Sequence, residues 1–386
     1  MFTTVSERSG HLAPCAGNAH SFEPTPLPPD LSLNPEQWRQ VADAEFTLGQ
    51  LQGHLDQSDW PQGLIRLAAL QEAVASSQLE GWDLSLRDAL WWQLDGSVDE
   101  LRSRAGALRL THQHADLLME TLQAPDRQDL RELHARLYRT VQGREAQAGQ
   151  LRSSLIWLGP RGTTAQDAPY VPPAPAGLPD HIRQLEVFQK TASHWPRLVL
   201  AGLLYYQIET LHPFLDGSGR LARSVMIHIL GGGRDRMATL LLRPSRLWQR
   251  STAEHFRQLQ SLREHGDYET WIAAFAGSIK QSALEAISLL GSVTRWQDEA
   301  DQKLLEDLPG QRKVGGHLFR FLPAQPIVDV STVAERCGRN FANANILMQR
   351  LVEIGLLQEI TGRRRNRRYV APGLIDVLGE GLSSPL

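Results

Sequence analysis

The chain has 386 residues, which is long enough for two or three packed units rather than one core. It carries 40 Lys and Arg against 43 Asp and Glu, a formal net charge of -3, so no global positive field attracts it to nucleic acid or anionic lipid. Only Cys15 and Cys337 are present, which excludes a disulfide framework and a metal site of paired thiolates. Any binding to nucleic acid or anionic lipid must therefore depend on a local cluster of basic residues.

The sequence predicts neither export nor a membrane-spanning segment. The N-terminus has no apolar run of the kind that a secretory signal requires, and the longest apolar stretch, residues 198–206, is far below the ~20 residues of a membrane-spanning helix. These observations predict a cytoplasmic protein with no membrane partner. Residues 1–30 are rich in Pro and Gly and are predicted to be an extended, Pro-rich lead-in.

The next region, residues 31–125, is predicted to be helical. It opens with Asn34 as an N-cap and Pro35 in the first turn. Apolar periodicity then predicts helices over residues 38–55, 64–79, 87–94 and 98–122.

Residues 126–296 are predicted to be the catalytic core. A short hairpin with a loose loop is expected first, from the strand-like runs 154–158 and 170–171. Helices are then expected over residues 180–190, 197–211, 219–230, 253–263 and 270–298. A charged stretch, residues 297–315, is predicted to be a linker.

Residues 316–386 carry a different pattern. A helix from Ser331, a turn at Gly338 and a second helix over residues 341–354 have the spacing of a helix-turn-helix. Two strand-like runs follow, at residues 356–360 and 368–370. The order predicts a winged helix domain.

The segment with the clearest chemistry, residues 211–223, reads LHPFLDGSGRLAR. Gly217 and Gly219 lie where a helix begins, so backbone N–H groups and the positive end of the helix dipole can face an anion. Arg220 and Arg223 lie on one face of that helix and can bind further phosphate oxygens.

Two more residues of this segment complete a site for phosphoryl or nucleotidyl transfer. Asp216 offers a hard oxygen ligand for Mg²⁺, and His212 can take a proton from a hydroxyl near neutral pH. Anion site, cation ligand and base are thus gathered around one turn.

The segment resembles the signature of the Fic family, His-Pro-Phe-x-[Asp/Glu]-Gly-Asn-[Gly/Lys]-Arg-x-x-Arg, and the similarity extends over about residues 35–286. The resemblance implies an enzyme, a protein adenylyltransferase that moves AMP from ATP to a hydroxyl of a target protein, with Mg²⁺ as cofactor. The resemblance implies that His212 is the catalytic base and that Asp216 is the metal ligand. The implied nucleotide-binding residues are Gly217, Ser218, Gly219, Arg220 and Arg223.

Ser218 departs from that signature, which has Asn at this position. A Ser hydroxyl is shorter than an Asn side chain and has no amide donor. By analogy with lost oxyanion-hole donors, the change can lower the rate by ~10²-fold. The resemblance therefore predicts the reaction, and Ser218 predicts a reduced rate.

An upstream hexapeptide, Ser76-Ser-Gln-Leu-Glu80-Gly81, is similar to the inhibitory motif of the same family. It implies an ion pair between Glu80 and Arg223 that blocks productive binding of ATP. Acidic charge at a helix C-terminus is disfavoured by the helix dipole, so a cationic partner for Glu80 is physically reasonable. The alternative is a surface carboxylate before a capping glycine.

The predicted hairpin resembles the family's flap. Such an edge can align a target segment through main-chain hydrogen bonds, with Leu155, Ile156 and Trp157 as its docking residues. The alternative is a plain surface hairpin with Trp157 in a core. The target, which can be the chain itself, is not identified by the sequence.

The region after residue 316 holds the main basic cluster, Arg363–Arg365 with Arg367 and Arg368. It can contact nucleic-acid phosphates, and polar side chains of the second helix can contact base edges. Alternatively this domain docks a protein or forms a homodimer.

The predicted whole is an all-α Fic core with a small β-hairpin flap, an N-terminal inhibitory helix and a C-terminal winged helix. The predicted function is Mg²⁺- and ATP-dependent protein AMPylation restrained by Glu80. Two alternatives stay open: de-AMPylation or transfer of another phosphate-containing group at the same site, and a weakly active, nucleotide-sensing regulator that binds DNA.

Overall fold

The computed structural model describes residues 5–15, 19–56, 62–94, 99–123, 129–139, 141, 147–160, 162–232 and 236–379. The predicted boundary between residues 125 and 126 and the predicted helix start at residue 98 lie outside them. Within these ranges the chain is mainly helical with two small antiparallel sheets, so the mainly α fold class is confirmed. None of the described helices is long and apolar enough to cross a bilayer.

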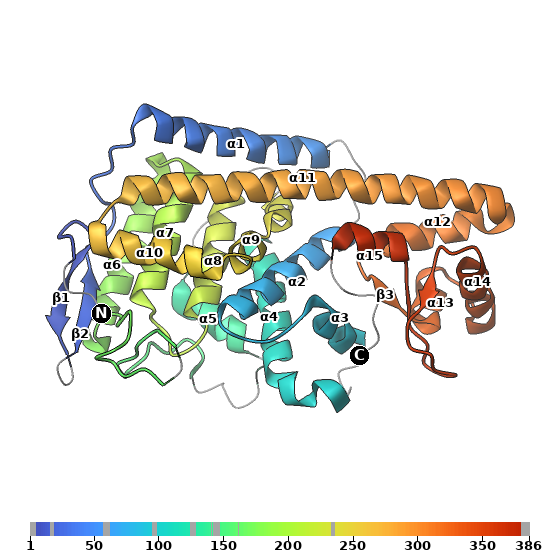
Figure 1. Cartoon of the computed structure of the whole chain (residues 1–386), viewed down its shortest axis with the longest axis horizontal. Helices are drawn as coiled ribbons and strands as arrows, with labels where there is room; N and C mark the ends of the chain where they lie inside the picture. Colours follow the sequence, from blue (N-terminus) through green and yellow to red (C-terminus); the bar gives the residue numbers. More distant parts are fainter. Residues whose placement is uncertain are drawn as a thin grey trace.

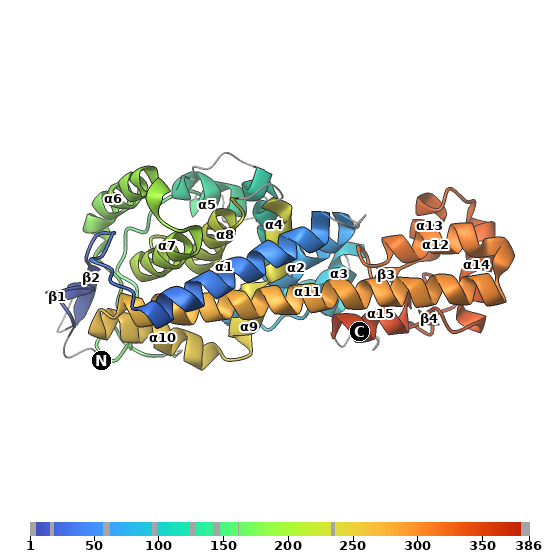
Figure 2. The same cartoon turned by 90° about the horizontal axis from the view of Figure 1, so that it is seen from above.

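Two long helices run side by side along the molecule. Helix α11 (Tyr268–Asp307) extends over most of its length, and α1 (Pro35–Asp56) lies against the N-terminal part of α11 in both views (Figures 1 and 2). Helix α1 begins as predicted, since the side chain of Asn34 accepts a hydrogen bond from the backbone N–H of Gln37 at 2.9 Å.

Two buried helices carry the candidate site. Helix α7 (Arg197–Leu211) is buried along nearly its whole length and packs on α8 (Ser218–Leu230), α11 and α6 (Leu178–Thr191). Helix α2 (Gln62–Leu79) is buried between α4 (Ala105–Gln123) and α9 (Pro244–Gln249). The other helices of this part are α3 (Leu86–Leu94), α5 (Leu130–Tyr138) and α10 (Thr252–His265), with 3-10 turns at Asp99–Arg104, Pro175–Gly177, Ala192–His194 and Arg236–Leu242.

The N-terminal lead-in is folded, which corrects the prediction of an extended segment over residues 1–30. Strands β1 (Gly10–Pro14) and β2 (His20–Pro24) form an antiparallel hairpin in which Leu12 lies opposite Phe22. Phe22 is fully buried, and its backbone N–H donates to the carbonyl of Val171 at 2.9 Å. The hairpin thus depends on contacts with residues far along the chain, which local Pro and Gly content cannot reveal.

The predicted linker at residues 297–315 is also wrong, because α11 continues through it to Asp307. Trp296, Ala300 and Leu304 are buried at helical spacing and continue the apolar face of α11, while the charged residues lie on its other side. A short turn (Pro309–Gln311) then leads to α12 (Arg312–Phe321), which packs back on α11. The charge run is therefore a solvated helix face.

The C-terminal elements lie at the far end of α11 from the N-terminal hairpin (Figure 1). Helices α13 (Val330–Arg336) and α14 (Phe341–Glu353) are joined by a turn, as predicted. A three-stranded sheet follows, formed by β3 (Ile327–Val328), β5 (Tyr369–Val370) and β4 (Gln358–Glu359) in that order, and α15 (Pro372–Leu378) returns to α11. The identification of this region as a winged helix stays a prediction.

The predicted flap hairpin is reduced to a single antiparallel bridge between Leu158 and Tyr170. The backbone N–H of Leu158 donates to the carbonyl of Tyr170 at 2.8 Å. On either side the chain follows turns rather than a strand ladder. Pro160 and Pro169 cannot donate to a ladder, which is one physical reason why the pairing stops there.

Candidate active site

The loop between α7 and α8 is held by unusual backbone conformations. His212 ends α7 in the left-handed region, with φ 42 and ψ 61, and its N–H donates to the carbonyl of Ile208 at 3.0 Å. A non-glycine residue is uncommon there, and the strain costs roughly 1–2 kcal/mol. Gly217, with φ 85, makes the second left-handed turn directly before α8. The loop is thus bent sharply at both ends.

His212 is half-buried, and its side chain lines a cavity beside the loop. Burial lowers the pKa of its imidazole to about 4, although the Glu80 carboxylate opposes this shift. Its Nδ1 atom has no hydrogen-bond partner among the residues that the structure describes. The ring is therefore neutral near pH 7 and can accept a proton.

Arg152 fixes the backbone of this loop from the flap side. Its Nε atom donates to the carbonyl of His212 at 2.8 Å, and its own N–H donates to the carbonyl of Pro213 at 2.9 Å. Its Nη2 atom donates to the carbonyl of Pro173 at 2.6 Å. This role of Arg152 was not predicted from the sequence, in which its only signal is its position just before the strand-like run 154–158.

Helix α5 supports the other side of the loop through His134. The ring stacks on Phe214 with 3.9 Å between centroids, and Nδ1 accepts a hydrogen bond from the N–H of Gly149 at 2.9 Å. Nε2 therefore carries the proton and donates to the carbonyl of Asp216 at 3.1 Å. Burial lowers the pKa of His134 to about 4, which keeps the ring in this neutral form.

Helix α8 begins at Ser218, and its first backbone N–H groups have no partner within the helix, which is the arrangement that an anion site requires. Gly219 lies against Glu80: a Cβ at this position would come within 2.3 Å of Glu80 Oε1 and 3.0 Å of Arg223 Nη1. A side chain at this position would therefore displace Glu80 or Arg223 from the ion pair.

Ser218 does not present its side chain to the cavity. Its hydroxyl accepts a hydrogen bond from the N–H of Phe214 at 3.0 Å and donates to the carbonyl of the same residue at 3.2 Å. The residue is fully buried. The predicted nucleotide-binding role is therefore corrected for the side chain, which stabilises the loop, and only the backbone N–H is left for a ligand.

Asp216 and Arg220 form an ion pair across the first turn, with Oδ1 3.2 Å from Nη1. The described residues include no cluster of three or more His, Cys, Asp or Glu that could hold a metal. Asp216 is about one-quarter exposed, and its carboxylate is a hard oxygen ligand. This donor set fits Mg²⁺, which commonly takes one or two carboxylates and completes its shell with phosphates and water.

Arg223 is the centre of a buried polar network beneath the loop. Its Nη2 atom lies 2.5 Å from Glu80 Oε1, and its Nη1 atom lies 3.2 Å from Glu209 Oε1. Its Nε atom donates to the hydroxyl of Ser76 at 2.7 Å. The side chain is only 2% exposed, so these partners replace water around the guanidinium.

Glu80 follows the last residue of α2, and the left-handed Gly81 (φ 84) ends the helix. Burial opposes ionisation of Glu80, but the charges of Arg223 and Arg220 outweigh it and lower the pKa of the carboxyl. Ser76 contributes a second contact, since its carbonyl accepts a hydrogen bond from Arg223 Nη2 at 3.3 Å. The ion pair expected from the hexapeptide is therefore present.

Glu209 is the second acidic partner of Arg223, and it was not among the site residues predicted from the sequence. Burial, with a contribution from the nearby Glu80, raises the pKa of Glu209 to about 7 although Arg223 opposes the shift. One signal could have found it: a single carboxylate in the otherwise apolar run of α7, three residues before His212 and therefore on the same face.

A cavity of about 600 Å³ lies beside the flap, and Glu80, Glu209, His212 and Arg223 all line it. Its wall combines the site residues with apolar side chains of the flap and of α10. The lining residues are Leu79, Glu80, Trp157, Leu158, Gly159, Pro169, Tyr170, Glu209, His212, Arg223, Ala253, Phe256, Arg257, Leu259, Gln260 and Arg263. Apolar walls with a few convergent charges are typical of sites for small ligands.

Of the three predicted docking residues, only Trp157 lines this cavity. Its side chain is 44% exposed, so it is no core residue, and its Nε1 atom donates to the carbonyl of Thr163 at 2.7 Å. Leu155 and Ile156 are half-buried and lie outside the cavity wall. The structure thus brings Trp157, His212, Arg223 and Glu80 together, with Leu155 and Ile156 adjacent in the chain.

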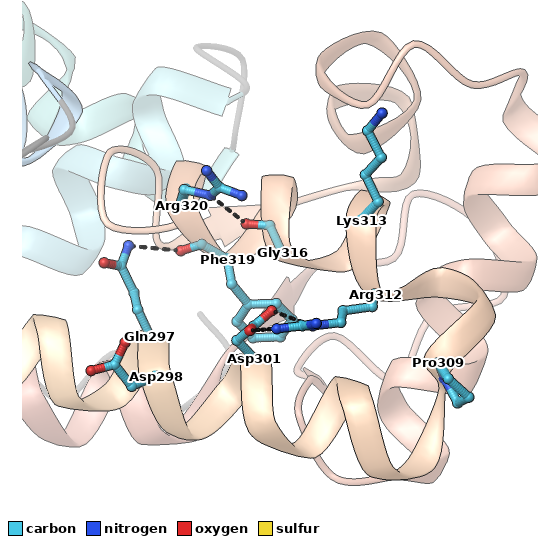
Figure 3. Close-up of a pocket in the computed structure, with 9 residues that line it drawn as sticks. All are labelled: Gln297, Asp298, Asp301, Pro309, Arg312, Lys313, Gly316, Phe319 and Arg320. Carbon is cyan, nitrogen blue, oxygen red and sulfur yellow. Dashed lines mark hydrogen bonds and ion pairs between the residues drawn. The ribbon is translucent and has the colours of Figure 1, made fainter.

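A second cavity of about 600 Å³ lies between α11 and α12 and shares no lining residue with the first (Figure 3). Four of its polar side chains have partners within the protein. Arg312 pairs with Asp301 at 2.6 Å, and Gln297 Nε2 donates to the carbonyl of Phe319 at 3.3 Å. Arg320 donates to a carbonyl of its own helix. We therefore place the chemistry at His212 and not here.

Two family models match the chain. The model described as "Fic/DOC family" matches residues 124–230, and the model described as "Fic/DOC family N-terminal" matches residues 38–105. The first range contains the loop from His212 to Arg223, and the second contains Ser76 to Gly81. The resemblance stated from the motifs is thus confirmed.

Two solved structures are similar to the chain. The chain is similar to a Fic family protein from Desulfovibrio desulfuricans G20, with a TM-score of 0.57 and 17% identity, over 89% of this chain and 98% of that chain. It is also similar to Fic-1 (residues 134–508) from C. elegans, with a TM-score of 0.49 and 15% identity, over 67% of this chain and 73% of that chain. The first likeness supports the fold.

Proposed function

The chain belongs to the Fic/DOC family, and from this premise we propose that it transfers AMP from ATP to a hydroxyl side chain of a protein, which can be the chain itself. The family is known for AMPylation or related group transfer. The observation that carries the proposal is the meeting of His212, Glu80 and Arg223 at one cavity, with Gly219 of the α8 N-terminus packed against Glu80 and Arg223.

In the proposed reaction, the target hydroxyl attacks the α-phosphorus of ATP. A new P–O bond forms, the bond from the α-phosphorus to the bridging oxygen of the β-phosphate breaks, and pyrophosphate leaves. The hydroxyl proton goes to His212. Because its ring is neutral at pH 7, it is ready to accept that proton without first losing one.

The phosphates are proposed to bind where the first N–H groups of α8 and the guanidinium groups of Arg220 and Arg223 converge. Asp216 is the residue that would hold Mg²⁺, which supplies charge neutralisation on the phosphates when bound. Trp157 and Phe256 offer exposed aromatic surface at the cavity wall for an apolar or planar group.

Glu80 is proposed to restrain this reaction. Its carboxylate occupies one side of Arg223, at 2.5 Å, so a phosphate oxygen that needs the same guanidinium must displace it. A carboxylate and a phosphate oxygen are equivalent acceptors for Arg, so both cannot use the same N–H groups at once. Release of Glu80 would then permit productive binding.

That release is proposed to be local, because α2 cannot leave without breaking the core. Glu72 is fully buried and accepts a hydrogen bond from the N–H of Ser245 at 3.0 Å. Most apolar residues of α2 are buried as well. Exposing several of them would cost roughly 1.5–3 kcal/mol each. Rotation of the Glu80 side chain about its own torsions needs none of this.

The test is to incubate the Glu80→Gly protein with ATP and Mg²⁺, alone and in lysate, and to look by mass spectrometry for an adenylate adduct. We expect an adduct from Glu80→Gly, little from wild type, and a loss of roughly 10²–10⁴-fold when His212→Ala is added.

Ser218→Asn in the same background separates two questions. An adduct that forms only when Asn is present would contradict native AMPylation activity. No adduct from either protein would contradict AMPylation by this site altogether. An adduct of different mass, or removal of AMP from a modified protein, would favour another transfer reaction at the same loop.

A further inference from the structure

Charge is distributed very unevenly along this chain. Residues 312–379 hold eleven Lys and Arg against five Asp and Glu, whereas the rest of the chain holds 29 against 38. The formal charge of -3 therefore conceals a basic region at one end of the molecule, formed by α12, α13, α14 and the β4–β5 connection (Figure 1). A local positive field of this kind attracts polyanions.

The β4–β5 connection is a tight loop whose tip carries arginines. The N–H of Ile360 donates to the carbonyl of Arg368 at 2.9 Å, which closes its base. Glu359 Oε1 accepts hydrogen bonds from the N–H groups of Thr361 at 2.8 Å and Gly362 at 3.1 Å. The carboxylate of Glu359 is therefore occupied by hydrogen bonds within the turn.

The arginines at the tip are directed outward. Arg363, Arg364 and Arg365 are all exposed. Arg368, in contrast, is buried and pairs with Asp329. One arginine of this run therefore stabilises the fold through a buried ion pair, and three are exposed to solvent.

Helix α14 lies beside this loop and has two distinct faces. Ala344, Leu347, Met348 and Leu351 are buried against the domain core. The exposed residues of the helix are Phe341, Ala342, Asn343, Ile346, Gln349, Arg350, Val352 and Glu353. Glu353, in the last turn, is its one acidic residue.

A direct contact joins the loop to this helix. Arg367 Nη2 donates to Asn345 Oδ1 at 3.0 Å. The basic loop is thereby held next to α14, and Asn340, whose side chain accepts from the N–H of Asn343 at 2.8 Å, caps the helix start. Helix and loop form one surface, which we call the α14 surface.

We propose that the α14 surface binds double-stranded DNA, with α14 in the major groove and Arg363, Arg364 and Arg365 on the phosphates. The major groove is about 12 Å wide and admits one helix. Small and amide side chains, such as Ala342 and Gln349, can approach base edges, and Ile346 can contact a thymine methyl group. The exposed charge of this surface is basic and favours a polyanion, and competition by polyglutamate distinguishes DNA from an acidic protein.

The inference does not depend on the reaction at His212, because it uses none of the residues of that site. Its test is the binding of the full-length chain to a short fluorescent DNA duplex, measured by anisotropy over a salt titration. We expect binding that weakens by roughly 40-fold or more between ~50 and ~200 mM salt, since three phosphate contacts alone produce a slope of about -2.7.

The decisive variant replaces Arg363, Arg364 and Arg365 by Ala. Its affinity at low salt should fall by roughly 10- to 100-fold and its salt slope by about 2 to 3. The matched control replaces Arg39, Arg66 and Arg183, which are exposed elsewhere, by Ala. It has the same change in net charge and should keep its affinity within about 2-fold.

A third variant, Ile346→Glu, tests the groove contact. Ile346 is 48% exposed, so the change leaves the core intact, and a circular dichroism spectrum verifies folding. We expect binding to be lost. Wild-type protein without salt-dependent binding, an equal loss in the control variant, survival of binding in Ile346→Glu, or equal competition by polyglutamate would each overturn the proposal.

Discussion

Arginines gather in two places in this protein, and the two clusters are built in opposite ways. Arg223 is 2% exposed and contacts two carboxylates and a hydroxyl. Arg364 and its neighbours are exposed at the tip of a loop. Both clusters were predicted to be phosphate-binding from their sequence, yet only the second presents its charge to solvent.

The difference bears on how each cluster would meet an anion. A buried guanidinium accepts a ligand only by exchanging a partner, so its occupancy is controlled by Glu80 and Glu209. An exposed guanidinium attracts any polyanion at a distance, and salt screens that attraction. The first arrangement suits a restrained reaction, and the second suits a binding surface.

The largest expected effect is on stability. Arg223→Met leaves two buried carboxylates without their shared cation, which should lower the free energy of unfolding by about 3–5 kcal/mol. The matched exposed variant, Arg364→Met, should change it by less than about 0.5 kcal/mol. Urea unfolding curves of both proteins measure the contrast. Equal losses would show that burial is not what separates the two clusters.

The next effect is a pH dependence from Glu209. Its pKa is raised to about 7 in the folded protein from an ordinary value of 4.5, so the folded state holds a proton that the unfolded chain has released. Its stabilising contribution is present below pH ~4.5 and is lost as the pH rises to ~7, by about 3 kcal/mol in total.

The difference in unfolding free energy between wild type and Glu209→Gln isolates this contribution from that of other groups. We expect wild type to lose stability relative to Glu209→Gln between about pH 5 and 7. A difference that does not vary with pH would contradict the raised pKa.

A smaller effect is expected on nucleotide affinity. Glu80→Gln keeps the shape of the side chain and removes its charge, which weakens the contact with Arg223. A charge-assisted hydrogen bond contributes about 1.5–3 kcal/mol, so ATP should bind roughly 10- to 100-fold more tightly. Calorimetric titration of both proteins checks this. The substitution Glu306→Gln, at an exposed site on α11, is the matched control and should leave affinity unchanged.

The smallest expected effect concerns the order of the basic loop. Asn345→Ala removes the acceptor of Arg367 at 3.0 Å and loosens the loop from α14. One such hydrogen bond contributes about 0.5–1.5 kcal/mol, so DNA affinity should fall by roughly 2- to 10-fold. No change in anisotropy titrations, with a loss in the triple arginine variant, would show that the loop acts without α14.

Much of the fold and site could be predicted because it rests on local signals. The start of α1 could be predicted from the capping residue Asn34, and the start of α8 from the glycines around Ser218. The spacing of His212, Asp216 and Arg223 places all three around the turn before α8. The pair of Glu80 and Arg223 was expected because the hexapeptide from Ser76 to Gly81 resembles the family's inhibitory motif, and the helix dipole made a cationic partner for Glu80 reasonable.

The rest depends on long-range contacts that no local pattern contains. Phe22 is buried against residues near Val171, so the N-terminal hairpin could not be seen from its own composition. Ser218 was given a ligand-binding role, whereas its hydroxyl is used within the loop by Phe214. Glu209 was overlooked because its raised pKa comes from burial and from Glu80, a residue of another helix.

The most direct test of the proposed restraint and reaction uses Glu80→Gly protein with ATP radiolabelled at either the α- or the γ-phosphate. The account predicts that label from the α-phosphate becomes attached to protein, that label from the γ-phosphate does not, and that His212→Ala abolishes the attachment. Label from the γ-phosphate, or α-label that persists without His212, would contradict it.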